Sequence, residues 1–289
     1  MSTPGSVTVV ERWRLARAEI DAAIDSWLGE LPEASVVDAA RYIAMGGKRL
    51  RGFLVLEAAE SLGASRDAAI DAAVAVELVH AASLALDDII DEDVTRRGFE
   101  AAWVRFGLKK TVMVSNLLIP FAQRIVEMKY GGEALERTVA AWLDISRGEV
   151  IDAFLPPEKL APETYMEMIR LKTGALFRLS AELGVLAAGR RDLLEVASHY
   201  GETLGIVYQI ADDIRDSRDP RKLEREPSLR LFIRWMGGDT SKPLDTIERL
   251  IREAESLAEK MAPGSYTLRV LPRFIVNAML ANIDGDGGG

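Results

Sequence analysis

The sequence predicts an all-α protein, because apolar residues recur at helical spacing along almost the whole chain and sustained two-residue alternation is hard to find. The first expected helix illustrates the pattern, since Trp13, Ile20, Ile24 and Leu28 fall on one helical face. The breaks between the apolar stretches are also short. We therefore expect a single-domain helical bundle over residues 1–289.

Apolar stretches define the expected helices along the chain. The first contains the periodic face, the fourth and eighth contain the apolar stretches AASLAL and GIVYQIA, and the seventh contains the largely apolar YMEMIRLKTGALFRLSAELG. Breaks fall at Pro156-Pro157 and at Gly237-Gly238, and neither is long enough for an interdomain linker. The ends, about 1–8 and 283–289, are expected to be flexible. The expected helices span 9–29, 34–45, 49–63, 66–94, 108–128, 133–153, 163–188, 191–217, 242–261 and 267–282.

Composition excludes several classes of function. Without cysteine there is no disulfide framework, thiolate metal site or cysteine nucleophile, which is typical of a reducing cytosol. The net charge of −9 and the pI near 5.0 argue against a general nucleic-acid surface. No basic segment followed by an apolar stretch opens the chain, and no run approaches the roughly 20 apolar residues of a membrane helix. We expect a cytoplasmic protein with no nucleic-acid partner and no transmembrane segment.

Two acidic triplets follow the two apolar stretches. The first is Asp87, Asp88 and Asp91, and the second is Asp212, Asp213 and Asp216. With 45 acidic residues in 289, about one such triplet is expected by chance, so a single copy could be a solvated helix end. Carboxylates one helical turn apart can instead bind Mg²⁺, and a cation would offset their crowding at the negative end of a helix. The second copy and the apolar approaches favour the metal interpretation.

Basic residues occur at junctions between the expected helices. One group is GGKRLR, with Lys48 and Arg51, and the other is Arg96-Arg97-Gly98. Glycines allow close backbone approach and arginine forks bind phosphate oxygens, so these groups are candidates for diphosphate binding. A solvated surface patch is the alternative for each. Lys172 adds a cation within an apolar helix, and His80, two turns before Asp87, is either a ligand or a buried structural histidine.

The motifs GGKRLR, ELVHAASLALDDIIDEDVTRRG, KTG and GIVYQIADDIRD resemble, in order and approximate spacing, the trans-isoprenyl diphosphate synthases, also called polyprenyl synthetases. The resemblance covers roughly residues 40–220. It implies an all-helical bundle around a deep central cavity, a homodimer, and Mg²⁺ as cofactor, with three ions when substrate is bound. The implied reaction is a 1'-4, head-to-tail trans condensation of an allylic diphosphate with isopentenyl diphosphate.

The resemblance also implies roles for individual residues. Asp87, Asp91, Asp212 and Asp216 would bind Mg²⁺, with Asp88 and Asp213 supporting the two motifs. Arg96 and Lys172 would hold the allylic diphosphate. The isopentenyl diphosphate would be bound by Lys48, Arg51, His80 and Arg97. The oxygens of Thr173 and Gln209 would face the developing allylic cation.

Two features of this sequence modify the resemblance. The Gly-Lys that usually follows the second motif is absent from SRDPRKLEREPSL, which leaves Lys222 as a substitute. Ala82 and Ser83, one turn before Asp87, are small where farnesyl-producing relatives tend to carry aromatic plugs. A growing chain could pass this level, gaining about 0.8 kcal/mol per buried CH₂, so we predict a product of C20 or longer.

Other functions compatible with the sequence are a noncatalytic partner subunit of a heteromeric prenyl synthase and a Mg²⁺-dependent hydrolase of a phosphate-containing substrate. Loss of an aspartate motif would mark the first, and both motifs are intact. The hydrolase would not explain the apolar approaches to both triplets. A helical-repeat binding protein is disfavoured, because the sequence shows no self-similarity at 30–45 residues.

Overall fold

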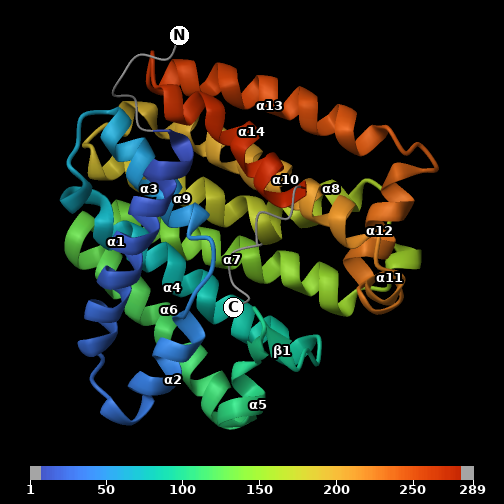
Figure 1. Ribbon diagram of the computed structural model, residues 1–289, viewed down its shortest axis with the longest axis horizontal. Coiled ribbons are helices and arrows are strands. Elements are labelled where there is room, and N and C mark those ends of the chain that lie inside the picture. Colours follow the sequence, from blue (N-terminus) through green and yellow to red (C-terminus); the bar gives the residue numbers. More distant parts are fainter. Residues whose placement is uncertain (1–7, 281–289) are drawn as a thin grey trace. The chain divides into compact units, whose positions relative to one another are not determined.

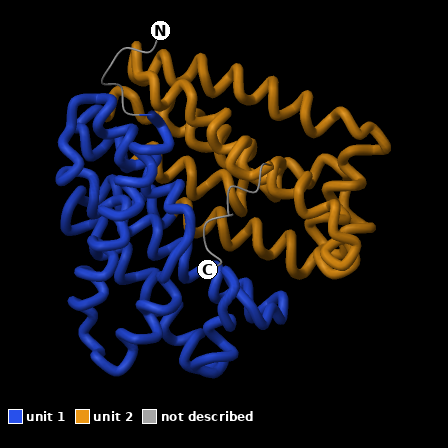
Figure 2. Tube along the Cα trace, viewed as in Figure 1, with its two compact units in different colours: residues 1–139, 183–190 blue, residues 140–182, 191–289 orange. Residues whose placement is uncertain are grey.

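The computed structural model describes residues 8–280 and divides into two compact units (Figure 2). Unit 1 comprises residues 1–139 and 183–190, and unit 2 comprises residues 140–182 and 191–289. The chain passes between them three times, within α7 (Gly132–Phe154), within α9 (Ala175–Ala187) and between residues 190 and 191. The single domain over 1–289 stays a prediction. Of the ends expected to be flexible, Thr8 is described and caps a helix, whereas 1–7 and 283–289 lie outside the described residues.

The predicted all-α class is confirmed, and unit 1 is built around one long central helix (Figure 1). This helix, α4, packs against α3 and α6, and α1 packs against both α3 and α4. Thr8 and Glu11 form a capping box that begins α1. The helices of this unit are α1 (Val9–Gly29), α2 (Ala34–Ala44), α3 (Leu50–Ser61), α4 (Arg66–Ile90), α5 (Ala102–Phe106) and α6 (Leu108–Tyr130).

Helix α4 has the length and composition of a membrane span, which the sequence analysis missed. In the 18-residue apolar stretch of α4 that is long enough to cross a membrane, 67% of the residues are buried. Its buried positions include many alanines, such as Ala69, Ala72, Ala75 and Ala82, which allow neighbouring helices to approach closely. A core helix with contacts on several sides is apolar all round, so burial accounts for this composition.

A small hairpin follows α4, although the lack of sustained two-residue alternation predicted no strands. Strand β1 (Thr95–Arg96) pairs antiparallel with β2 (Phe99–Glu100). Two-residue strands are too short to produce an alternating pattern, so no such pattern marks them in the sequence. Helix α4 also ends at Ile90 rather than at 94 as expected.

Helix α10 is the central helix of unit 2 and packs against α13, α14 and the turn η2. The expected helix 163–188 consists of α8, a π-helical turn η2 and α9 in succession. Helices α11 and α12 were not predicted. Unit 2 includes the second part of α7, from residue 140 onward. Its other elements are η1 (Pro157–Lys159), α8 (Thr164–Ile169), η2 (Arg170–Gly174), α9, η3 (Arg191–Leu193), α10 (Leu194–Asp216), α11 (Pro220–Arg225), α12 (Pro227–Met236), α13 (Lys242–Met261) and α14 (Tyr266–Leu280).

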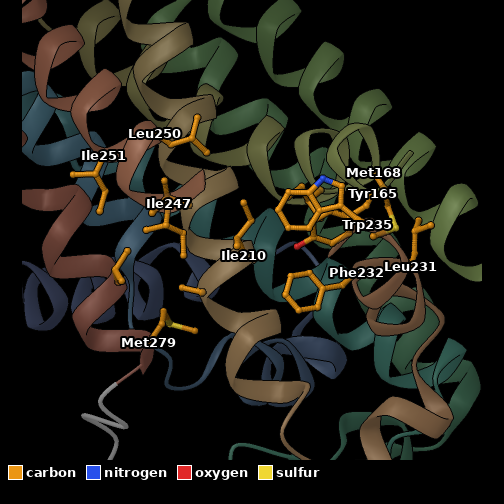
Figure 3. Packing of buried hydrophobic residues seen from close by; sticks show 14 residues of the cluster. Tyr165, Met168, Ile210, Leu231, Phe232, Trp235, Ile247, Leu250, Ile251 and Met279 are labelled. Atoms are coloured by element: carbon orange, nitrogen blue, oxygen red, sulfur yellow. The ribbon is translucent and has the colours of Figure 1, made fainter. Parts of the chain in front are cut away.

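An aromatic cluster lies in the core of unit 2 (Figure 3). Tyr165 of α8 packs against Phe232 and Trp235 of α12, with ring centroids 5.3 and 5.0 Å apart. Ile210 of α10 belongs to the same buried cluster. Aromatic rings in such tilted arrangements contribute packing energy beyond their buried area. The cluster therefore packs α12 against α8 and against α10, which carries the second acidic triplet.

Candidate active site

The carboxyl end of α4 presents the first acidic triplet. Asp87 lies in the last turn and Asp91 caps the helix, donating its N–H to the Asp87 carbonyl oxygen at 2.8 Å. The middle residue differs, because Asp88 is only 2% exposed and accepts a hydrogen bond from Arg96 Nε at 2.7 Å. Burial raises the pKa of Asp88, although the Arg96 guanidinium acts in the opposite direction. Asp88 therefore orients Arg96, and Asp87 and Asp91 share the neighbouring face.

Arg97 joins the hairpin to the glycine-rich loop before α3. Its Nη1 donates to the Met45 carbonyl oxygen at 2.5 Å, and a Cβ at Gly47 would lie 2.9 Å from Arg97 Nη2. Gly47 also has φ of +98°, a conformation that favours glycine. The next residue, Lys48, accepts a hydrogen bond on its carbonyl oxygen from Trp13 Nε1 at 2.6 Å. The loop that carries Lys48 is thus fixed from two sides.

Four arginines contribute positive potential at His80, and we call them the arginine cluster: Arg49, Arg51, Arg96 and Arg97. Arg51 Nη1 lies 3.1 Å from His80 Nε2. A guanidinium can only donate, so Nε2 accepts and the imidazole is neutral. The pKa of His80 is well below its ordinary value, first because of burial and then because of these four positive charges. Such a concentration of guanidinium groups is suited to binding an anion.

Arg49 was not predicted as a distinct residue of this site. It is 4% exposed and has a left-handed backbone with φ of 51°. Its guanidinium donates to Asp21 Oδ1 at 2.7 Å and to the Ala44 carbonyl oxygen at 2.5 Å, and lies 3.5 Å from Glu77. The sequence shows only a run of basic residues, since the partners of Arg49 come from other helices.

The two residues predicted to control chain length differ in burial. Ala82 is fully buried, and Ser83 is partly buried and donates its hydroxyl to the His80 carbonyl oxygen at 2.9 Å. Only Ser83 therefore presents surface that a ligand could contact without a shift in packing.

In unit 2, glycines bring three helical segments into close contact at η2. A Cβ at Gly205 of α10 would lie 2.7 Å from Gly174 Cα, and one at Gly148 of α7 would lie 2.5 Å from the Lys172 backbone nitrogen. Real Cβ atoms do not approach this closely, so α10 and α7 need glycine at these points. This packing places Lys172 and Thr173 beside α10.

Lys172 makes two ion pairs with α7. Its Nζ lies 2.7 Å from Asp152 Oδ2 and 2.8 Å from Glu149 Oε2. The other oxygen of Asp152, Oδ1, is buried and accepts no hydrogen bond from the described residues. Asp152 and Glu149 were not predicted as site residues, although their spacing of three residues on a helix places both on the face toward Lys172.

A chain of hydrogen bonds connects Thr173 to a buried tyrosine. Thr173 Oγ1 donates to Gln209 Oε1 at 2.7 Å, and Gln209 Nε2 donates to Asp213 Oδ1 at 2.9 Å. The Tyr165 hydroxyl donates to Asp213 Oδ2 at 2.6 Å. Burial raises the pKa of Asp213 to about 8, although the hydrogen bonds from Tyr165 and Gln209 lower it. Asp213, like Asp88, is therefore an inward-facing carboxyl group, and Tyr165 is a residue that the sequence analysis missed.

The outer aspartates of the second triplet are paired with basic side chains. Arg215 forms ion pairs with Asp212 and, at 2.8 Å, with Asp216. Lys222 Nζ lies 2.5 Å from Asp216 Oδ2, so this proposed substitute for the missing lysine does reach the triplet. Positive charge thus collects where two carboxylates meet the negative end of α10.

The carboxylates fit a hard divalent cation in residue type and spacing, although within residues 8–280 no three acidic or histidine side chains converge on one metal position. Asp212 and Asp216 lie one turn apart on α10 and both require a compensating cation. Asp87 and Asp91 have the same spacing on α4.

The structure thus brings together some of the predicted site residues within each unit. In unit 1 these are Arg51 with His80, and Asp88 with Arg96. In unit 2 Thr173 contacts Gln209, whereas Lys172 is paired with α7. The distant partners were missed because their contacts depend on tertiary packing.

Comparison with known proteins identifies the family. Residues 33–226 match the polyprenyl synthetase family. The chain is 34% identical over 293 residues to the hexaprenyl pyrophosphate synthase of Saccharolobus solfataricus, covering 96% of this chain and 99% of that protein. It is 31% identical over 285 residues to the geranylfarnesyl diphosphate synthase of Methanosarcina mazei, covering 95% and 96% of the two chains.

A solved structure supports the same assignment. The polyprenyl synthase of Caulobacter crescentus, determined with calcium and isoprenyl diphosphate, superimposes with a TM-score of 0.76 at 26% identity and covers 95% of this chain and 99% of that one. The motifs, the helical fold and nearly full-length similarity agree, and the chain belongs to the polyprenyl synthetase family.

Proposed function

We propose that the protein is a Mg²⁺-dependent prenyltransferase that condenses an allylic diphosphate with isopentenyl diphosphate in a 1'-4 trans reaction. The observation that carries this proposal is the pairing of two features on α4. The arginine cluster around His80 is suited to a diphosphate, and Asp87, two helical turns further on the same face, begins a pair of carboxylates suited to a metal. The family supports the same reaction, because relatives over nearly the full chain bear names of prenyl diphosphate synthases.

The two diphosphates would be bound by different basic groups. Lys48, Arg51, His80 and Arg97 would hold isopentenyl diphosphate, since the neutral His80 can bind an anion only together with its surrounding guanidinium groups. Arg96, oriented by Asp88, and Lys172, oriented by Asp152, would hold the allylic diphosphate. A diphosphate oxygen would then form an ion pair with Lys172 in place of one of its present ion pairs, with Asp152 or Glu149.

The reaction begins with loss of the allylic diphosphate as a leaving group. Mg²⁺ ions, three when substrate is bound, would be held by Asp87, Asp91, Asp212 and Asp216 and would offset the negative charge that develops on this group. Arg96 and Lys172 add hydrogen bonds that strengthen as the bond breaks. The oxygens of Thr173 and Gln209 stabilise the allylic cation, which the isopentenyl double bond attacks. The departing diphosphate accepts the proton that completes the step.

We further propose a product of C20 or longer. The small side chains of Ala82 and Ser83 leave no aromatic barrier one turn before Asp87. The product names of the two relatives, hexaprenyl and geranylfarnesyl, support a long chain.

The decisive experiment incubates the purified protein with radiolabelled isopentenyl diphosphate, Mg²⁺ and each of the C5, C10, C15 and C20 allylic diphosphates. Elongated products of C20 or more are expected, with chain length measured by chromatography. A product that stops at C15 would contradict the chain-length proposal. No incorporation with any primer would contradict the stand-alone enzyme and favour a noncatalytic partner subunit, and release of phosphate alone would favour a hydrolase.

Arg215 is expected to weaken metal binding at the second triplet, because its guanidinium occupies the same two carboxylates. Arg215→Gln should lower the Mg²⁺ concentration needed for half-maximal activity about 3- to 10-fold, corresponding to a half-buried ion pair of roughly 0.7–1.4 kcal/mol. It should also enlarge the rise in melting temperature that Mg²⁺ with inorganic diphosphate produces. Arg218→Gln removes the same charge from an exposed position three residues away and serves as the control. Equal metal responses in both variants would disprove the expectation.

We also propose a homodimer in the cytoplasm, with residues 1–289 as one domain. Several apolar side chains on α6, including Val112, Met113 and Met128, are exposed and would be covered by a second copy. Light scattering should give about twice the chain mass of 31.7 kDa. A mass equal to one chain at assay concentration would contradict the dimer.

A further inference from the structure

We propose that Tyr165 is a positioning residue, which acts through Asp213 to fix the side-chain amide of Gln209. This inference rests on the proposed function, in which the oxygens of Gln209 and Thr173 face the allylic cation. Tyr165 itself touches neither substrate nor metal in this proposal. It is fully buried on α8, and Figure 3 shows it among the core residues Met168, Phe232 and Trp235.

The hydrogen bonds leave one arrangement for the Gln209 amide. In its ionised form Asp213 accepts from the Tyr165 hydroxyl on Oδ2 and from Gln209 Nε2 on Oδ1, so both of its oxygens are used. Because Gln209 Nε2 points to Asp213, its Oε1 points the other way, to the Thr173 hydroxyl at 2.7 Å. A reversed amide would put Oε1 against an acceptor and Nε2 against the Thr173 hydroxyl. Tyr165 thus sets the position of Asp213, and Asp213 sets the direction of the amide.

Rigid packing makes Tyr165 suited to this role. Its ring is held by Phe232 and Trp235 at centroid distances of 5.3 and 5.0 Å, so the hydroxyl has little freedom to follow a moving partner. Without the hydroxyl, Asp213 Oδ2 would be buried without a donor, and the carboxyl group would turn toward another one. Gln209 Nε2 already donates to this group, at 2.9 Å.

The protein contains a matched control. Tyr200 of α10 is also fully buried in unit 2, and its hydroxyl donates to the Leu268 carbonyl oxygen at 2.6 Å, the same length as the bond from Tyr165 to Asp213. Tyr165→Phe and Tyr200→Phe therefore remove the same group from similar surroundings. Both should lower the melting temperature by about 2–4 °C. Only Tyr165→Phe should affect Gln209.

The sequence also permits a direct spectroscopic test, because glutamine occurs only at 123 and 209. Selective ¹⁵N-glutamine labelling gives one pair of side-chain amide signals for each. Tyr165→Phe should shift or broaden the Gln209 pair and leave that of Gln123, on α6, unchanged. Tyr200→Phe should change neither. This measurement requires no enzymatic activity, so its failure is distinct from failure of the proposed function. An unchanged Gln209 signal in Tyr165→Phe, or an equal change in Tyr200→Phe, would overturn the inference.

Kinetics test the consequence for the reaction. Tyr165→Phe should lower kcat about 10- to 100-fold, the usual effect of losing a residue that orients a site group. The KM for isopentenyl diphosphate should stay unchanged, because Lys48, Arg51 and His80 belong to unit 1. Combined with Gln209→Ala, the substitution should have no further effect, since both act through one amide. Additive losses would overturn the inference.

Asp213→Leu provides a second variant should Tyr165→Phe fold poorly. Leucine is close in size to aspartate and removes the acceptor of both the Tyr165 hydroxyl and Gln209 Nε2. The Gln209 signals should therefore shift although Tyr165 is intact. Unchanged signals in this variant would also contradict the relay.

Discussion

Asp87→Asn is expected to lower kcat for prenyl transfer on the order of 10³-fold or more, because a neutral amide cannot replace an anionic Mg²⁺ ligand. Asp87 lies in the last turn of α4, where Asp91 completes a pair of carboxylates one turn apart. A loss of this size corresponds to about 4 kcal/mol of transition-state stabilisation. The measurement is the rate of isopentenyl incorporation at saturating substrate.

Glu92→Gln is the control for this substitution. Glu92 is exposed, lies one residue beyond Asp91 and loses the same charge. Its variant should retain wild-type kcat. If both variants lost activity equally, the effect would come from the net charge near the end of α4 rather than from a ligand at Asp87.

Gly205→Ala should both destabilise the protein and impair the reaction. The new Cβ would lie 2.7 Å from Gly174 Cα and 3.1 Å from the Thr173 carbonyl oxygen, so α10 and η2 must separate. We expect a loss of about 1–3 kcal/mol of stability from overpacking, which exceeds the gain of up to about 1 kcal/mol from better helix propensity. The separation would also lengthen the 2.7 Å bond between Thr173 and Gln209, and kcat should fall.

Gly132→Ala makes the same chemical change where there is room. Gly132 begins α7, and no heavy atom lies within 4 Å of the position its Cβ would take. Its melting temperature should equal or slightly exceed that of the wild type, and its activity should be unchanged. Equal destabilisation of the two variants would show that loss of a helical glycine, and not close packing at η2, causes the effect.

The sequence predicted most of the helices because each buries one face, and this produces a periodic pattern. Helix α12 was missed although Leu229, Phe232 and Trp235 have helical spacing, since charged residues precede it and Gly237-Gly238 suggested a loop. The hairpin at 95–100 could not be predicted, because two residues per strand provide no alternation.

The site was predictable to the extent that its residues are close in sequence. Asp87 and Asp91, or Asp212 and Asp216, are neighbours on a helix, so spacing alone reveals them. Tyr165 contacts Asp213 across 48 positions, and no local pattern announces such a pair. The inward orientation of the middle aspartates also depends on packing, because within the motif they look like their neighbours.

The π-helical turn η2 has a consequence for the backbone conformation that the site tolerates. In a regular α-helix, side chains as far apart in sequence as those of Tyr165 and Thr173 point in directions that differ by roughly 80°. The wider π turn between them takes up one additional residue and reduces this angle, so that both side chains reach α10. Replacing the π turn by a regular α-helix of the same length would turn Thr173 away from Gln209 while every predicted site residue remained present. This segment is therefore constrained in backbone conformation as well as in residue type, and a relative with both aspartate motifs but a regular helix of equal length here would lack the contact.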